Sequence, residues 1–299
     1  MDAIVTYENR QRGPEWLPEF SISLLTKVCK VPRSSYYDWA RSREAIARRR
    51  EADNLLKDQI LVVYKKSRNN YGVPKITEVL RSSGVHISRK KVANLMVDLG
   101  MRGACGRKKI KTTRRDKLAS PSPDLVNRDF SAKGADQLYV SDLTYIPTKE
   151  GWLFLVAILD VFTRRIVGWS MATHMRTELF LDALRQAQLT RGRSTFSGTI
   201  FHSDHGSQYT SVEFRAMLKV MGIEQSMGTV GDSYDNALAE NLWSLLKRET
   251  DYSDNFETVE EARIAIFDWI NWYNKERIHS SIRYLSPVKF EELLLKEVA

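Results

Sequence analysis

The fold is decided by residues 139–171, which read YVSDLTYIPTKEGWLFLVAILDVFTRRIVGWSM. Three segments rich in β-branched and aromatic residues, 138–146, 152–160 and 165–171, are separated by short polar stretches such as 148–151. Such segments with such short connections predict three sequential antiparallel strands.

The chain that follows adds helices to these strands. Residues 177–189 and 211–221 repeat apolar side chains at helical spacing, and Gly222 is placed to end the second helix. Between them, residues 199–203 read as a short buried strand. Strands with interleaved helices predict a mixed α/β layer architecture.

The sequence pattern of the N-terminal third predicts helices rather than strands. Residues 21–30 and 31–39 resemble two short helices around a Pro-containing turn, either a small DNA-contacting unit or a packing arm. Residues 47–100 then predict a long helix, a second helix begun by Pro74 and a third capped by Ser88. This order is typical of a small all-α helix-turn-helix region.

Basic residues concentrate in and after this region. Arg89, Lys90 and Lys91 fill the first turn of the third helix, where they oppose the helix dipole, so DNA contact is one interpretation and a solvated helix end the other. Residues 101–120 cannot form a core and predict a linker along DNA, or a solvated spacer. The linker residues expected to bind DNA are Lys108, Lys109, Arg114 and Arg115.

Composition narrows the partners and the compartment. The 299 residues carry a formal charge of +9, which favours a polyanionic partner such as double-stranded DNA. The two cysteines, Cys29 and Cys105, form no disulfide or zinc pattern, which fits a reducing cytoplasm. The longest mostly apolar run, 152–162, is far below the roughly 20 residues that span a bilayer, so no membrane anchor is expected.

Three acidic residues stand where a carboxylate needs an explanation. Asp142 lies inside an otherwise apolar strand, and Asp204 ends the apolar strand 199–203, a position at which α/β sheets bind ligands. Glu240 lies on a predicted helix, on a stripe with Trp243 opposite the apolar face. Three carboxylates predict a site for Mg²⁺ or Mn²⁺, with two ions about 4 Å apart suited to displacement at phosphorus.

Each acid taken alone has an ordinary explanation, such as a turn cap, an ion pair or a solvated helix face. Together with their surroundings they carry a resemblance. The segments are YVSDLTYIPTKEGWLFLVAILDVFTRRIVGWSM, FHSDHGSQYTS, DNALAENLWSLLKRE and NKERIHSSIRYLSPVKFEE. They are similar to the integrase core of the DDE transposases, specifically the second-frame product of the insertion-sequence-3 family, over roughly residues 45–295.

The resemblance implies a ribonuclease H-like fold in which Asp142, Asp204 and Glu240 are catalytic metal ligands, with thirty-five residues between the last two. It also implies cleavage of element ends followed by strand transfer, joint action of at least two protomers, and a preceding-frame product as partner. The expected division is an N-terminal helical segment, a helix-turn-helix region, a basic linker and a catalytic core with C-terminal helices, over residues 1–46, 47–100, 101–134 and 135–295.

Other polar residues receive smaller roles. Lys247 lies on the face of Glu240 and is expected to contact DNA, and Arg277 in the basic stretch 274–281 is expected to grip DNA behind the core. His202 and His205 are expected to support the acids or contact DNA. Residues 228–231 suggest a mobile loop or an ordinary connection. Asp160 is interpreted as a turn or ion-pair residue. A capping box at Thr258 begins a helix in which Trp269 and Tyr273, at core spacing, are expected to pack rather than to stack on bases.

Three alternatives remain open. A retroviral-type integrase shares the core, but its zinc module needs histidines, and only His86 precedes the core. A catalytically inactive DNA-binding regulator of transposition would occupy DNA ends without cutting them, and metal-dependent cleavage separates it from an enzyme. A ribonuclease H-like nuclease would not explain the helix-turn-helix region and the basic linker.

Overall fold

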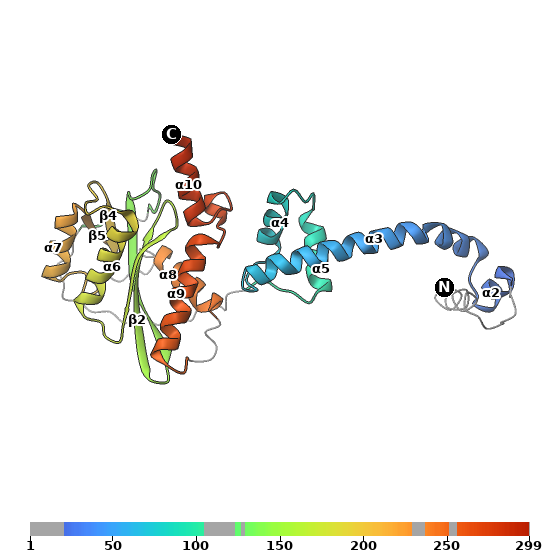
Figure 1. Cartoon of the computed structure of the whole chain (residues 1–299), viewed down its shortest axis with the longest axis horizontal. Coiled ribbons are helices and arrows are strands. Elements are labelled where there is room, and N and C mark those ends of the chain that lie inside the picture. The colour runs from blue at the N-terminus through green and yellow to red at the C-terminus, as the bar shows by residue number, and fades with distance from the viewer. Residues whose placement is uncertain (1–20, 105–122, 127–128, 229–236, 251–255, 299) are drawn as a thin grey trace.

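The computed structural model describes residues 21–104, 123–126, 129–228, 237–250 and 256–298. Its N-terminal part is helical, and a compact α/β core follows in sequence (Figure 1). The N-terminal helices are α2 (Ile22–Val28), α3 (Arg33–Lys66), α4 (Val73–Ser82) and α5 (Arg89–Asp98). Figure 1 shows α3 extending far beyond the other helices toward the N-terminus.

Helix α3 is longer than the sequence suggested. The second of the two expected short helices does not stand apart, because it continues without interruption into the long helix. No glycine or proline occurs between Arg33 and Lys66. Nothing in that stretch therefore breaks the helical hydrogen-bond ladder.

The expected three-helix arrangement forms where α3, α4 and α5 meet. Ile60 of α3, Ile76 of α4 and Val92 of α5 are all fully buried in one cluster. The hydroxyl of Ser88 accepts a hydrogen bond from the backbone N–H of Lys91 at 3.2 Å, which caps α5 as predicted.

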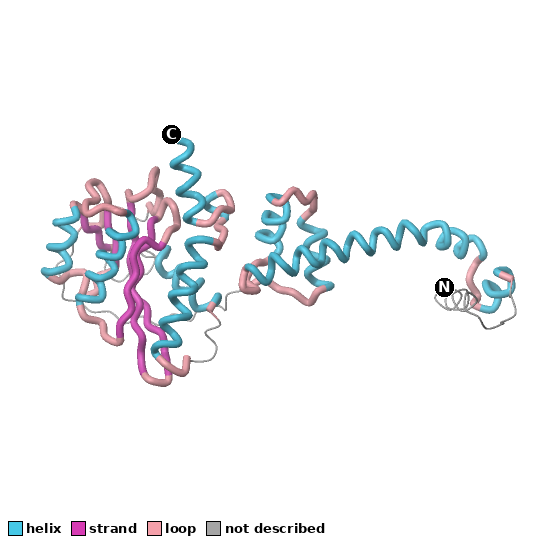
Figure 2. Tube along the Cα trace, viewed as in Figure 1, coloured by secondary structure: helices cyan, strands magenta, loops and turns pink. Residues whose placement is uncertain are grey.

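The core is built on a five-stranded sheet of order β3-β2-β1-β4-β5 (Figure 2). The strands are β1 (Leu138–Thr148), β2 (Gly151–Asp160), β3 (Ile166–Ala172), β4 (Ile200–Ser203) and β5 (Glu224–Met227). The first three are antiparallel as predicted, and β4 and β5 are parallel to β1. Strand β5 was not predicted, because its sequence EQSM shows neither alternation nor β-branched residues.

Helices α6 (Thr177–Arg191) and α7 (Val212–Met221) cover one face of the sheet. Gly168 of β3 makes the close packing of α6 possible, because a Cβ at this position would lie 2.2 Å from the carbonyl oxygen of Ala183. Gly222 ends α7 in the left-handed conformation with φ of 71°, as predicted.

The other face is covered by α8 (Ala237–Glu249) and α9 (Val259–Lys275), and α10 (Pro287–Val298) packs against α9. Thr258 caps α9 by accepting the N–H of Glu261 at 3.1 Å. Trp269 and Tyr273 of α9 are buried, which confirms that these two aromatic residues form core, whereas Phe267 of the same helix is exposed. None of the helices in the described ranges is long and apolar enough to span a membrane.

The helical region touches the core through α9 and the chain that follows it. The guanidinium of Arg68 forms an ion pair with Asp268 at 2.7 Å and lies over the ring of Trp272 at 5.2 Å. The backbone N–H of Ile278 donates to the Tyr71 hydroxyl at 2.8 Å. These contacts fix the start of α4 beside the end of α9.

Candidate active site

The pairing of β1 with β4 brings two of the three predicted acids together. In this parallel pair Val140 lies opposite His202. Continuing the same register by two residues places Asp142 level with Asp204, which follows directly after β4. The sequence separation of these two acids gives no hint of this, because it depends on which strands pair and in which register.

Asp142 lies half-buried on the sheet face that α8 covers. One carboxylate oxygen accepts the backbone N–H of Leu143 at 2.8 Å, and the other accepts the indole N–H of Trp243 at 2.9 Å. Burial, together with the charges of Asp204 and Glu240, nevertheless raises the pKa of the Asp142 carboxyl to about 7. A cation at this place would relieve both the desolvation and the repulsion.

Asp204 and Glu240 approach Asp142 from two different elements. Asp204 is exposed in the turn after β4, where one of its oxygens accepts the N–H of Gly206 at 3.0 Å. Glu240 lies in the first turn of α8 and is half-buried. Both influence the pKa of Asp142, so the three carboxylates share one neighbourhood.

The donor set fits a hard divalent cation in its chemistry, because all three groups offer carboxylate oxygens. Across the described residues, no three His, Cys, Asp or Glu side chains are grouped closely enough to hold a metal ion. The three carboxylates are therefore neighbours but are not close enough together to form a complete metal site. Residues 229–236, which include part of the stretch suggested as a loop before α8, lie outside the described residues.

The stripe predicted on α8 faces the acids. Trp243 is 7% exposed and binds Asp142 directly, a role that the sequence did not assign although it placed this residue on the correct face. The ammonium of Lys247 lies 5.6 Å from the centre of the Tyr145 ring. Burial lowers the pKa of Lys247, and the nearby charge of Asp142 opposes this shift. Lys247 is thus positioned beside the acids and still exposed.

The two histidines around Asp204 take part in local structure. His202 is 1% exposed, and its Nδ1 lies 3.0 Å from the Ser226 hydroxyl of β5. Nε2 of His205 hydrogen bonds with the carbonyl oxygen of Gly228. The first histidine is buried in the sheet, and the second links the turn after Asp204 to the end of β5.

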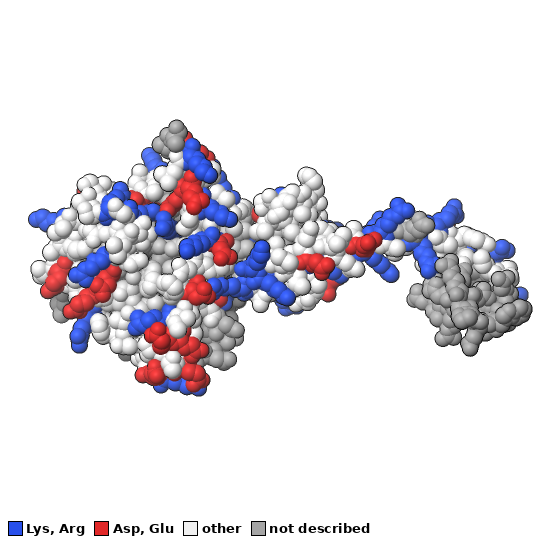
Figure 3. All heavy atoms as spheres, viewed as in Figure 1, with Lys and Arg blue, Asp and Glu red and all other residues white. Residues whose placement is uncertain are grey.

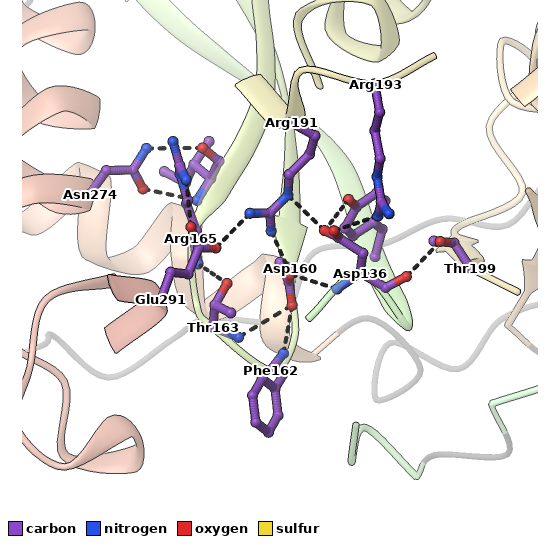
Figure 4. A network of polar contacts seen from close by, with 12 residues as sticks. Asp136, Asp160, Phe162, Thr163, Arg165, Arg191, Arg193, Thr199, Asn274 and Glu291 are labelled. Atoms are coloured by element: carbon purple, nitrogen blue, oxygen red, sulfur yellow. Dashed lines mark hydrogen bonds and ion pairs between the residues drawn. The ribbon is translucent and has the colours of Figure 1, made fainter. Parts of the chain in front are cut away.

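Asp160 is an ion-pair and turn residue, as predicted (Figure 4). It is fully buried at the end of β2, and its carboxylate accepts the N–H groups of Phe162 and Thr163. Arg191 donates to it at 2.7 Å and also pairs with Glu291 of α10 at 2.7 Å. This network joins the end of β2, the end of α6 and the C-terminal helix.

The basic residues predicted to bind DNA have different surroundings. Lys91 pairs with Asp53 of α3 at 2.6 Å, and Arg89 lies 3.9 Å from Glu78 of α4. Acidic side chains of neighbouring helices therefore offset part of the charge at the start of α5, and Lys90 remains exposed. Figure 3 shows basic side chains along α3 and where the helical region meets the core. The linker residues Lys108, Lys109, Arg114 and Arg115 lie outside the described residues.

Arg277 does not have the surface position expected from the sequence. Its side chain is 6% exposed and forms a two-pronged ion pair with Glu249 of α8, with N–O distances of 2.8 to 3.1 Å. A guanidinium that is buried and bound in this way is not available to grip DNA. The expectation was wrong because its polar sequence context does not show which side chains turn inward.

Known protein families match most of the described chain. The integrase core domain matches residues 132–233 and 221–287, and an HTH-like domain matches residues 51–109. Together with the mixed sheet and its helical covers, these matches define a polynucleotidyl transferase of the integrase-core class with a ribonuclease H-like fold and an HTH-like DNA-binding domain.

Full-length relatives identify the family within this class. The transposase for insertion sequence element IS629 of Shigella sonnei is 36% identical over 92% of both chains. Transposase InsF for insertion sequence IS3A of Escherichia coli strain K12 is 35% identical over 91% of this chain and 94% of that protein. The chain belongs to the insertion-sequence-3 family of transposases, as expected from its sequence segments, and its function is DNA transposition.

Two solved structures resemble the chain at lower similarity. The HTLV-2 integrase catalytic core domain, solved in complex with magnesium, covers 52% of this chain and 95% of its own, at 15% identity and a TM-score of 0.42. The catalytic core domain of BIV integrase covers 55% of this chain at 18% identity and a TM-score of 0.38.

Proposed function

We propose that Asp142, Asp204 and Glu240 bind Mg²⁺ or Mn²⁺, as a pair of ions, and that the protein cleaves element ends and transfers the resulting strand to target DNA. The observation that carries the proposal is the state of Asp142. This carboxyl is desolvated and repelled by two neighbouring carboxylates, yet it is held by two hydrogen-bond donors. Such an arrangement is costly unless a cation completes it.

The residues around the site have different roles in the proposed reaction. When bound, the ions would supply charge stabilisation to the attacking and leaving oxygens of an in-line displacement at phosphorus. Trp243 holds one oxygen of Asp142 and so orients the carboxylate. Lys247, exposed beside Asp142, contacts a phosphate of the DNA end. Water attacks a phosphodiester at the element end and displaces its 3′-oxygen, which leaves as a free 3′-OH. That hydroxyl then attacks a phosphodiester of the target DNA, forming a new ester bond while the 3′-oxygen of the target strand leaves.

The regions outside the core position the DNA. We assign end recognition to residues 47–100, with Lys90 exposed at the start of α5, and backbone contact to the basic linker 101–134. The core and C-terminal helices, residues 135–295, carry the chemistry. At least two protomers act on the two ends in the bacterial cytoplasm, and the preceding-frame product contributes to end recognition.

The test compares nicking and joining of element-end DNA in Mg²⁺ or Mn²⁺ by wild type and by Glu240→Gln. A matched control is Glu213→Gln, which makes the same change on the exposed face of α7. Wild type and the control are expected to cut and join, whereas Glu240→Gln binds DNA without cutting. If wild type binds and never cuts, even with the preceding-frame product, the protein is instead a DNA-binding regulator.

A further inference from the structure

A second site lies between the helical region and the core. A cavity of about 310 Å³ is bounded by α4, α8, the end of α9 and the turn after β2. Its wall contains Lys75, Arg164, Arg277 and His279, and none of its lining residues is acidic. A concentration of basic groups around a hollow is the usual signature of an anion site.

Three donors that line this cavity have no hydrogen-bond acceptor among the described residues. Among the described residues, no hydrogen bond or ion pair engages the Lys75 ammonium or the Arg164 guanidinium. The same holds for the hydroxyl of Tyr273, a side chain that is 2% exposed and lines the cavity. Lys75 and Arg164 are half-buried, and the Lys75 ammonium also lies 4.7 Å from the centre of the Tyr71 ring. Donors that are partly shielded from water and have no acceptor in the protein favour an acceptor from outside the chain.

Two of the remaining basic groups are already accounted for. Arg277 is neutralised by its pair with Glu249, and burial together with the charge of Arg277 lowers the pKa of His279 well below its usual value, so that this imidazole is neutral. The uncompensated positive charge therefore belongs to Lys75 and Arg164. Lys75 comes from the helical region and Arg164 from the core.

We propose that this cavity binds a phosphate group, held by Lys75 and Arg164 with Tyr273 donating to one of its oxygens. A tetrahedral dianion suits the site, because several oxygens can accept from an ammonium, a forked guanidinium and a hydroxyl at once. The serine hydroxyls of Ser280 and Ser281 at the rim offer further donors. The phosphate can come from a DNA backbone or from a free phosphate compound.

The site is separate from the candidate active site. Leu242 and Leu245 of α8 line the cavity, whereas Glu240 and Trp243 lie on the opposite side of the same helix. A helix with its side chains is about 10 Å across. A phosphate in the cavity is therefore not the one that is cut. Only the DNA source of the phosphate rests on the proposed function; the anion chemistry does not.

Burial also makes the site sensitive to pH. Desolvation lowers the pKa of Lys75 to about 7, and the charges of Arg277 and Arg248 act in the same direction while Glu249 opposes them. Lys75 is charged below this value and neutral above it. Because an anion binds the charged form, binding weakens as the pH rises through 7.

The experiment is equilibrium dialysis of the full-length protein against radiolabelled inorganic phosphate at constant ionic strength. Wild type is expected to bind one phosphate per chain, and Lys75→Gln and Arg164→Gln each weaken binding about tenfold or more. Lys219→Gln on the exposed face of α7 removes the same charge and is expected to bind like wild type. The unfolding midpoint of each variant is measured first, to show that the variant is folded. Because the two substitutions lie in different elements, a folded variant of either kind is enough to test the proposal.

A DNA arm distinguishes the two sources. If the phosphate belongs to DNA, both variants weaken end binding and lower its salt slope by about one. If end binding is unchanged while phosphate binding is lost, the ligand is a free phosphate compound. Phosphate binding that is equal in wild type and both variants overturns the proposal. Glu240→Gln keeps phosphate binding, so a failure of the metal chemistry leaves this result unaffected.

Discussion

Replacement of Arg277 tests whether its role is structural. Its guanidinium and the carboxylate of Glu249 are 6% and 4% exposed, and three N–O contacts of 2.8 to 3.1 Å join them. Arg277→Leu leaves the carboxylate buried with only the indole N–H of Trp269, at 3.2 Å, as donor. Removing one partner of a buried pair costs about 3–5 kcal/mol, which is the expected loss of unfolding free energy.

Urea unfolding followed by circular dichroism measures this loss. Arg185→Leu serves as control, because its pair with Asp182 is exposed on both sides and contributes about 1 kcal/mol or less. Adding Glu249→Gln to Arg277→Leu removes the buried charge and keeps an acceptor for Trp269, so most of the lost stability returns. The reasoning is refuted if the unfolding free energy of Arg277→Leu lies within about 1 kcal/mol of the wild-type value while the variant binds element-end DNA more weakly.

Three further predictions concern the other polar groups. Trp243→Phe removes the indole donor to Asp142 and is expected to weaken Mn²⁺ binding about 10- to 100-fold in a metal titration, a size usual for groups that orient metal ligands. Binding of sulfate, which does not titrate in this range, is expected to weaken between pH 6 and pH 8 in wild type and to stay constant in Lys75→Gln, as dialysis would show. Arg191→Leu leaves the buried carboxylate of Asp160 without a cation, and it is expected to cost about 3–5 kcal/mol at pH 8. Asp136 and Glu291 each lose one of two cations, because Arg193 and Arg165 still pair with them. That loss is smaller at pH 5, because stranded carboxylates take up protons; equal urea midpoints for this variant and wild type at pH 8 contradict the argument.

Local patterns were sufficient for the elements that carry strong periodicity. The β-branched and aromatic segments and the short turns of residues 138–171 predicted β1, β2 and β3, and the cap at Ser88 located the start of α5. Strand β5 was not predicted, because its four residues have no β pattern of their own. They form a strand only by pairing in parallel with the edge of β4. Its existence depends on tertiary pairing.

In the candidate site, too, some features follow from local sequence and others depend on tertiary structure. The sequence marked Asp142 as an acid within an apolar strand and put Glu240 on a helix face with Trp243, which local geometry can supply. Asp142 lies level with Asp204 because of the register between β1 and β4, and no local sequence pattern reveals that register. The burial of Arg277 depends on Glu249, twenty-eight residues away, so a basic stretch alone could not show it.

Helix α8 connects the two sites physically. One of its faces carries Glu240 and Trp243 toward Asp142, and the other carries Leu242 and Leu245 to the phosphate cavity. A ligand in the cavity binds only when α4 and the core are in contact, so it stabilises that contact by mass action. Coupling to the metal site requires more, because α8 must take different positions with and without the phosphate. If α8 stays rigid, phosphate tightens the junction and leaves Mn²⁺ affinity unchanged; if α8 shifts, each ligand changes the affinity of the other by the same factor.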